Sequence, residues 1–148
     1  MSEVLRGGCF CGAIRFELSA VYDAGYCHCS ICRRMSGAPA VAWANVLGRD
    51  FRLTQGSPRG FASTEPWRRY FCPDCGAPVY QRISAPPDDG SDQVSILIPS
   101  LDDPTAVRPT AHIWCASRLP FFQIRDDLPR FEDGELSPPS TRGFGSLE

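Results

Sequence analysis

The chain has 148 residues, of which 43% are hydrophobic and 11% aromatic, and this length and composition fit one folded domain rather than a disordered chain. The formal net charge of −2 argues against a general surface for nucleic acid or anionic membranes, because such a surface needs a basic excess. The start of the chain has no apolar stretch typical of a signal peptide, and no run approaches the roughly 18 apolar residues of a membrane helix. We therefore expect a soluble, cytoplasmic protein whose cysteines stay reduced.

Short strand signals recur along the chain and are separated by turn residues. In the first of them Ile14, Phe16 and Leu18 alternate with polar residues, which is the pattern of a half-buried strand. Further strands are predicted at Val41 and Trp43, Phe51–Leu53, Phe61, Trp67–Phe71, Val79–Ile83, Val94–Ile98 and Ala111–Cys115. The helix signal is limited to a short turn at Ser30–Met35 that ends at Gly37. These elements predict a mainly β, mostly antiparallel fold with little helix.

Two segments are predicted to lie outside the strands. Residues 85–92 are rich in Pro, Asp and Gly and have the composition of a surface loop. Residues 136–148 contain little that could be buried and predict a flexible C-terminal tail. We therefore expect a single β domain at 1–135, followed by the tail.

Seven of the eight cysteines fall in three tight clusters. The clusters are C-x-C at Cys9 and Cys11, C-x-C-x-x-C at Cys27, Cys29 and Cys32, and C-x-x-C at Cys72 and Cys75. A structural zinc site takes four thiolate or imidazole ligands, so two knuckles of two cysteines each close one site when the fold joins them. We predict such a structural zinc site at Cys9, Cys11, Cys72 and Cys75, which makes the domain a zinc-binding one.

The middle cluster, Cys27, Cys29 and Cys32, supplies three ligands for a second ion. Three protein ligands with an open fourth position are the pattern of a catalytic zinc, whereas closure by Cys115, His28 or His112 would make an inert site. Zn²⁺ with three thiolates carries a net charge of −1 and is a weaker Lewis acid than zinc held by neutral imidazoles. Such a site suits the binding of a soft substrate thiolate better than the activation of water.

Other polar side chains near the clusters have weaker assignments. Arg33 and Arg34 directly follow the middle cluster and are candidates to hold an acidic substrate, or are an ordinary solvated pair. His28 alternates away from the cysteines beside it, so we expect it to face solvent or a neighbour rather than to act as an acid–base group. His112 is predicted as a structural histidine and Cys115 as a small buried hydrophobe.

Four motifs occur in order along the chain. They are Gly7-Gly8-Cys9-Phe10-Cys11-Gly12, Cys27-His28-Cys29-Ser30-Ile31-Cys32-Arg33-Arg34, Phe71-Cys72-Pro73-Asp74-Cys75-Gly76 and His112-Ile113-Trp114. In these motifs the chain resembles the glutathione-dependent formaldehyde-activating enzyme family, whose domain also occurs in centromere-protein-V-like proteins. The resemblance extends from about Gly7 to about Phe131. The resemblance implies a β-tent fold of two antiparallel layers with zinc knuckles, and zinc ions at the two cysteine groups as divided above. It also implies a carbon–sulfur lyase activity, the addition of glutathione to formaldehyde that gives S-hydroxymethylglutathione.

Two functional hypotheses follow. The first is a zinc enzyme that acts on adducts of glutathione or another small thiol with an aldehyde, with the substrate sulfur at the ion held by Cys27, Cys29 and Cys32. The alternative is a non-catalytic zinc module that binds a protein or nucleic-acid partner, although the short pairs Arg33-Arg34 and Arg68-Arg69 are weak support for nucleic acid. A fourth protein ligand at the middle cluster favours the module, and an open position favours the enzyme. The sequence predicts neither a catalytic side chain nor an oligomeric state.

Overall fold

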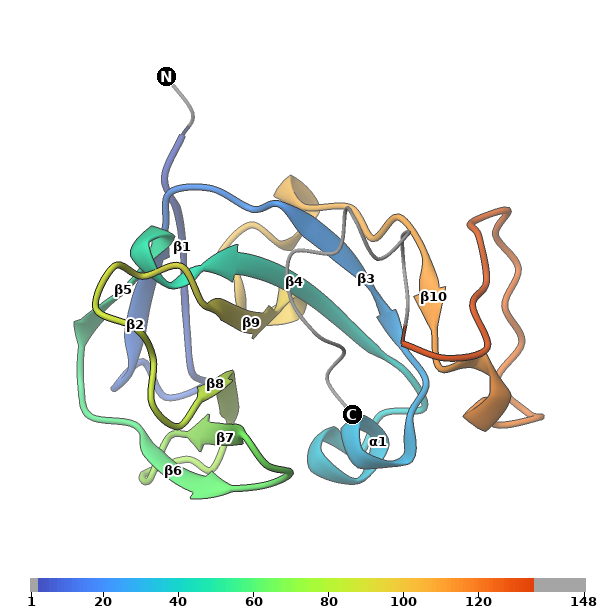
Figure 1. The fold of residues 1–148 in the computed structure, drawn as a ribbon, viewed down its shortest axis with the longest axis horizontal. Coiled ribbons are helices and arrows are strands. Elements are labelled where there is room, and N and C mark those ends of the chain that lie inside the picture. The colour runs from blue at the N-terminus through green and yellow to red at the C-terminus, as the bar shows by residue number, and fades with distance from the viewer. Residues whose placement is uncertain (1–2, 135–148) are drawn as a thin grey trace.

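The computed structural model describes residues 3–134, which form ten strands, one short α-helix and four short 3₁₀ turns (Figure 1). The strands are β1 (Leu5–Gly8), β2 (Arg15–Leu18), β3 (Asp23–Cys27), β4 (Val41–Leu47), β5 (Phe51–Gln55), β6 (Arg59–Ala62), β7 (Trp67–Phe71), β8 (Pro78–Ile83), β9 (Gln93–Leu97) and β10 (His112–Ile113). The mainly β class predicted from the sequence is therefore confirmed. The predicted tail at 136–148 lies outside the described residues.

The strands form two sheets. One has three strands in the order β1-β2-β5, and the other has seven in the order β10-β3-β4-β9-β8-β7-β6. Neighbouring strands pair antiparallel throughout, with one exception at the edge, where β10 runs parallel to β3. The predicted antiparallel, two-layer arrangement is thus confirmed apart from this short pair.

The main core lies between the two sheets. Phe16 of β2 is fully buried, and its ring stacks on Phe51 of β5 with 5.8 Å between centroids. Phe51 in turn contacts Tyr80 of β8 at 4.6 Å between ring centroids, so aromatic contacts bridge the layers. Alternate residues of a strand point to opposite faces, and one face of the seven-stranded sheet therefore supplies this core. The other face, called here the outer face, carries a second buried cluster that includes Cys27, Val41 and Trp43.

The helix α1 (Ser30–Ser36) lies beside the β6–β7 hairpin (Figure 1). It starts after Cys29, whose Sγ accepts a hydrogen bond from the Cys32 N–H at 3.2 Å. It ends because Gly37 adopts a left-handed φ of 75°, and its N–H donates to the Arg33 carbonyl at 2.7 Å. The predicted helix at Ser30–Met35 is confirmed with one added residue.

The sequence analysis did not predict two of the strands, β1 and β3. Their sequences, Leu-Arg-Gly-Gly and Asp-Ala-Gly-Tyr-Cys, lack the alternation of large apolar residues by which a strand is identified. Small residues are needed in β3, since a Cβ added to Gly25 would lie 2.7 Å from the Trp43 ring.

The predicted loop at 85–92 contains no strand or helix. No helix within residues 3–134 is long and apolar enough to span a bilayer.

Candidate metal centres

The first candidate centre consists of Cys9, Cys11, Cys72 and Cys75. Their Sγ atoms all lie within 4.8 Å of one another, although Cys11 and Cys72 are 61 residues apart in the chain. The first pair precedes β2, and the second follows β7 at a turn where Gly76 has a φ of 79°. The fold therefore brings together the two cysteine pairs that the sequence analysis assigns to one four-ligand site.

The sulfur positions of this centre fit a tetrahedral thiolate site. The Sγ atoms of Cys9 and Cys11 are 3.6 Å apart, and those of Cys11 and Cys72 are 3.7 Å apart. A zinc–sulfur bond of about 2.3 Å with tetrahedral angles puts the sulfurs about 3.8 Å apart. The Ile14 N–H donates to Cys9 Sγ at 3.2 Å, a contact that favours a thiolate. All eight cysteines are free, so no disulfide competes for these sulfurs.

The second candidate centre consists of Cys27, Cys29 and Cys32, all buried, with their Sγ atoms within 4.8 Å of one another. Cys27 ends β3, Cys29 caps α1, and Cys32 lies in the first turn of that helix. In the part of the chain that the structure describes, no fourth cysteine, histidine or carboxylate joins the group. The closure by Cys115, His28 or His112 considered from the sequence is therefore not found among residues 3–134.

Two of these buried thiols, Cys27 and Cys32, have pKa values that their neighbours shift in opposite directions. Hydrogen bonds with Cys29 and Cys32, together with burial, raise the pKa of Cys27. Hydrogen bonds from Cys27 and Cys29 lower the pKa of Cys32, against the effect of burial. Three thiolates at this spacing repel one another, and a divalent cation removes that repulsion. Three soft sulfur donors are the ligand set that zinc accepts.

Arg69 is the charged side chain that the structure adds to this centre. It projects from β7, and its Nη2 lies 3.9 Å from Cys32 Sγ, which helps to lower the pKa of Cys32. Its Nε is buried and has no hydrogen-bond partner among the described residues. The adjacent Arg68 instead donates to the Gly60 carbonyl at 2.9 Å. Alternation along β7 is a signal that the two arginines face opposite ways, but sequence alone does not place α1 over one of them.

A cavity of about 180 Å³ opens between α1 and the outer face of the sheet. Cys32 and Met35 of α1 line one wall, and Trp43, Arg69 and Gln81 of the sheet line the other. One ligand candidate of the three-cysteine centre therefore borders a space that a small molecule can enter. The four-cysteine centre does not border it.

The two histidines of the chain form a buried pair behind the three-cysteine centre. His28 is fully buried, and its Nε2 is 2.8 Å from His112 Nδ1. Burial, followed by the charge of His112, lowers the pKa of His28 to about 4. His112 Nε2 lies 3.0 Å from Asp126 Oδ2 and its ring stacks on Tyr26. His28 thus faces a neighbour rather than solvent, and His112 has the structural role predicted for it.

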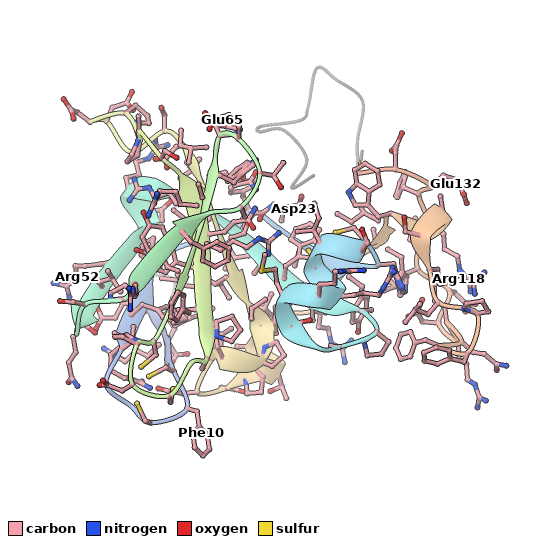
Figure 2. The ribbon with its side chains drawn as sticks, turned by 90° about the horizontal axis from the view of Figure 1, so that it is seen from below. Phe10, Asp23, Arg52, Glu65, Arg118 and Glu132 are labelled. Atoms are coloured by element: carbon pink, nitrogen blue, oxygen red, sulfur yellow. The ribbon has the colours of Figure 1, made fainter. Side chains whose placement is uncertain are left out.

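Arg33 forms hydrogen bonds with backbone carbonyl oxygens near the three-cysteine centre. Its Nη1 donates to the carbonyl oxygens of His28 and Ser117, both at 2.6 Å. These two hydrogen bonds connect the cysteine loop to Ser117, the residue before Arg118. In Figure 2, Arg118 and Arg52 of β5 lie on opposite sides of α1. Cys115 is half-buried and lies outside both cysteine groups.

Comparison with known proteins places these features in a family. Residues 4–117 match the family described as glutathione-dependent formaldehyde-activating enzyme. A protein of Halomonas elongata, provisionally named a glutathione-dependent formaldehyde-activating enzyme, is 31% identical over an 87-residue alignment that covers 52% of this chain and 55% of that protein. The match therefore spans about half the length of this curated relative.

A solved structure gives an independent comparison. The crystal structure of a Rhodobacter sphaeroides protein superposes with a TM-score of 0.50 at 26% sequence identity, covering 70% of this chain and 91% of that one. Because the family match covers residues 4–117, which is most of the chain, we conclude that the chain belongs to the glutathione-dependent formaldehyde-activating enzyme family.

Proposed function

We propose that the protein is a zinc-dependent carbon–sulfur lyase that acts on adducts of glutathione or another small thiol with an aldehyde, as an S-hydroxymethylglutathione synthase does. In this proposal Cys9, Cys11, Cys72 and Cys75 hold a structural zinc ion, and the three-cysteine centre holds a second one. The observation that carries the proposal is the position of Cys32, which lines an open cavity and whose sulfur lies beside Arg69.

The reaction is reversible and needs no oxidant or reductant. In the synthetic direction a thiolate sulfur donates an electron pair to the aldehyde carbon, a C–S bond forms, and the carbonyl oxygen becomes an alkoxide that takes a proton from solvent. In the lyase direction the hydroxyl loses this proton, the C–S bond breaks, and thiolate and aldehyde separate. Cys27, Cys29 and Cys32 would hold a zinc ion here, and its positive charge would lower the pKa of the substrate thiol.

Arg69 is the side chain that we place against the substrate oxygen. A guanidinium keeps its proton at all ordinary pH values, so Arg69 stabilises negative charge rather than transferring a proton. Its unpartnered Nε and its position beside Cys32 make it available to the alkoxide of the adduct. Such a donor is most effective where charge develops during the reaction, in a site that excludes water.

The binding of a thiol at the three-cysteine centre can be measured with cobalt in place of zinc. We expect glutathione to intensify the sulfur-to-cobalt charge-transfer band saturably, because a fourth sulfur joins the three from the protein. S-Methylglutathione, whose sulfur carries no proton to lose, serves as the control and should change the band far less. A spectrum that glutathione leaves unchanged at millimolar concentration contradicts the enzyme and favours the non-catalytic module.

Replacing Arg69 with methionine is expected to lower kcat/KM for adduct cleavage by about 100-fold, the usual effect of losing one donor to a developing oxyanion. Rates are measured by NMR exchange between the free aldehyde and its adduct. Arg68→Met is the matched control, since Arg68 contacts the Gly60 carbonyl instead of the cavity. Arg69→Lys should recover part of the loss, and zinc content should stay unchanged in all three variants. An Arg69→Met protein as active as Arg68→Met contradicts the assigned role.

A further inference from the structure

The size of the cavity beside Cys32 does not match a hydroxymethyl group. At about 180 Å³ it is comparable to engineered protein cavities of about 150 Å³ that bind benzene. It is smaller than the roughly 300–1,000 Å³ of pockets that enclose a whole drug-sized ligand. The body of a tripeptide thiol therefore has to lie outside, and the one carbon atom of formaldehyde would leave most of the space unfilled.

The chemistry of the wall is mainly apolar and aromatic. Trp43, which is 3% exposed, and Leu97 lie on the central strands β4 and β9. Phe71 and Phe61 line the cavity from β7 and β6, and Met35 lines it from α1. Side chains of this kind favour an apolar ligand group, because covering it removes hydrocarbon surface from water.

Two hydrogen-bond donors, one of them beside Cys32, interrupt the apolar wall. Arg69 and Gln81 are directly opposite each other in the pairing of β7 with β8. Gln81 is 5% exposed, and its Nε2 has no partner among the described residues, like the Nε of Arg69. Ser95, the next residue across the sheet, is already satisfied, since its hydroxyl donates to Asn45 Oδ1 at 2.6 Å. Buried donors without partners are costly, so the natural ligand brings an oxygen acceptor to this end of the cavity.

We infer that the cavity binds the aldehyde-derived part of the thiol adduct, and that the preferred substrates are adducts of aldehydes carrying an apolar group of up to one aromatic ring. The adduct oxygen lies at Arg69 and Gln81, and the apolar group lies against Trp43. The inference rests on the proposed function, because that function puts the substrate sulfur at Cys32 and its neighbours. It differs from that function in excluding formaldehyde as the best carbonyl partner.

The inference is tested by binding as well as by turnover. Calorimetry compares S-benzylglutathione with S-methylglutathione on the zinc-loaded protein, and we expect about 50-fold tighter binding of the benzyl compound from the ring surface that the cavity covers. NMR exchange then compares the adducts of formaldehyde, butanal and benzaldehyde with glutathione, and kcat/KM should rise in that order.

Variants at the cavity mouth make the test specific. Met35 is 39% exposed, and Met35→Trp fills part of the space, so the benzyl-to-methyl binding ratio should fall at least tenfold. Phe61→Trp, at the opposite wall and 38% exposed, gives the same test if the first variant folds poorly. Val4→Trp is the matched control, because Val4 is 38% exposed and does not line the cavity. It should keep the ratio of the parent protein.

The outcomes separate the two proposals. If the formaldehyde adduct turns over and the larger adducts do not, or if benzyl and methyl compounds bind equally, the inference is wrong while the lyase function stands. If no adduct turns over and glutathione leaves the cobalt spectrum unchanged, the lyase function fails and the inference falls with it. A benzyl preference that Met35→Trp or Phe61→Trp abolishes, together with faster turnover of the benzaldehyde adduct, supports the inference.

Discussion

Replacing Cys72 with serine is expected to reduce the bound zinc from two ions to one and to unfold the domain at physiological temperature. Cys72 is fully buried and lies among the four sulfurs that join the segment before β2 to the turn after β7. Metal binding to such sites contributes about 10–16 kcal/mol in small zinc domains, whereas whole domains are stable by only about 5–15 kcal/mol. Loss of the proposed structural ion would therefore remove an amount of free energy comparable to the total stability.

The matched control for this variant is Cys115→Ser. Cys115 is a half-buried thiol outside both cysteine groups, and its replacement should change the free energy of unfolding by less than about 1 kcal/mol. Metal content is measured by mass spectrometry and stability by circular dichroism on heating. A Cys72→Ser protein that retains two zinc ions, or that melts at the same temperature as Cys115→Ser, contradicts a structural role for the four-cysteine centre.

The arrangement of the cysteines was predictable because ligand number and knuckle spacing constrain it strongly. Two pairs can complete one tetrahedral set, and three cysteines within six residues can reach a common ion without help from the rest of the fold. Most strands were predictable for a similar reason, since apolar residues that alternate with polar ones, as Ile14, Phe16 and Leu18 do, all fall on one face of an extended chain. Both predictions depend on local sequence.

What the sequence did not predict depends on the register between distant strands. Arg69 reaches Cys32 because β7 lies near α1, and Gln81 lies beside Arg69 because β7 pairs with β8 at that register. Neither relation is encoded in a short stretch of chain. The strand β3 was missed for another reason, because Gly25 has no side chain and leaves room for the ring of Trp43. The cavity is therefore a product of tertiary packing.

Replacing Cys32 with serine is expected to abolish catalysis while leaving the fold intact. Removal of one of three ligands should release the second ion on dialysis and lower kcat/KM by at least about 100-fold, because even the loss of groups that merely support a ligand costs 10–100-fold. The stability should change little. Three cysteines within six residues can bind a zinc ion in the unfolded chain as well, and an ion that both states bind adds little to the free energy of unfolding. The four-cysteine centre differs because it joins cysteines 61 residues apart, which only the folded chain brings together.

The contrast between the two serine variants distinguishes the roles of the two centres. Cys32→Ser should keep one zinc ion, show a melting temperature close to that of Cys115→Ser, and lose the response of the cobalt spectrum to glutathione. A Cys32→Ser protein that still cleaves thiol–aldehyde adducts places the chemistry elsewhere, because Cys32 is the cluster member that lines the cavity and lies beside Arg69. One that unfolds like Cys72→Ser makes both centres structural, and the cavity beside α1 is then not a catalytic one.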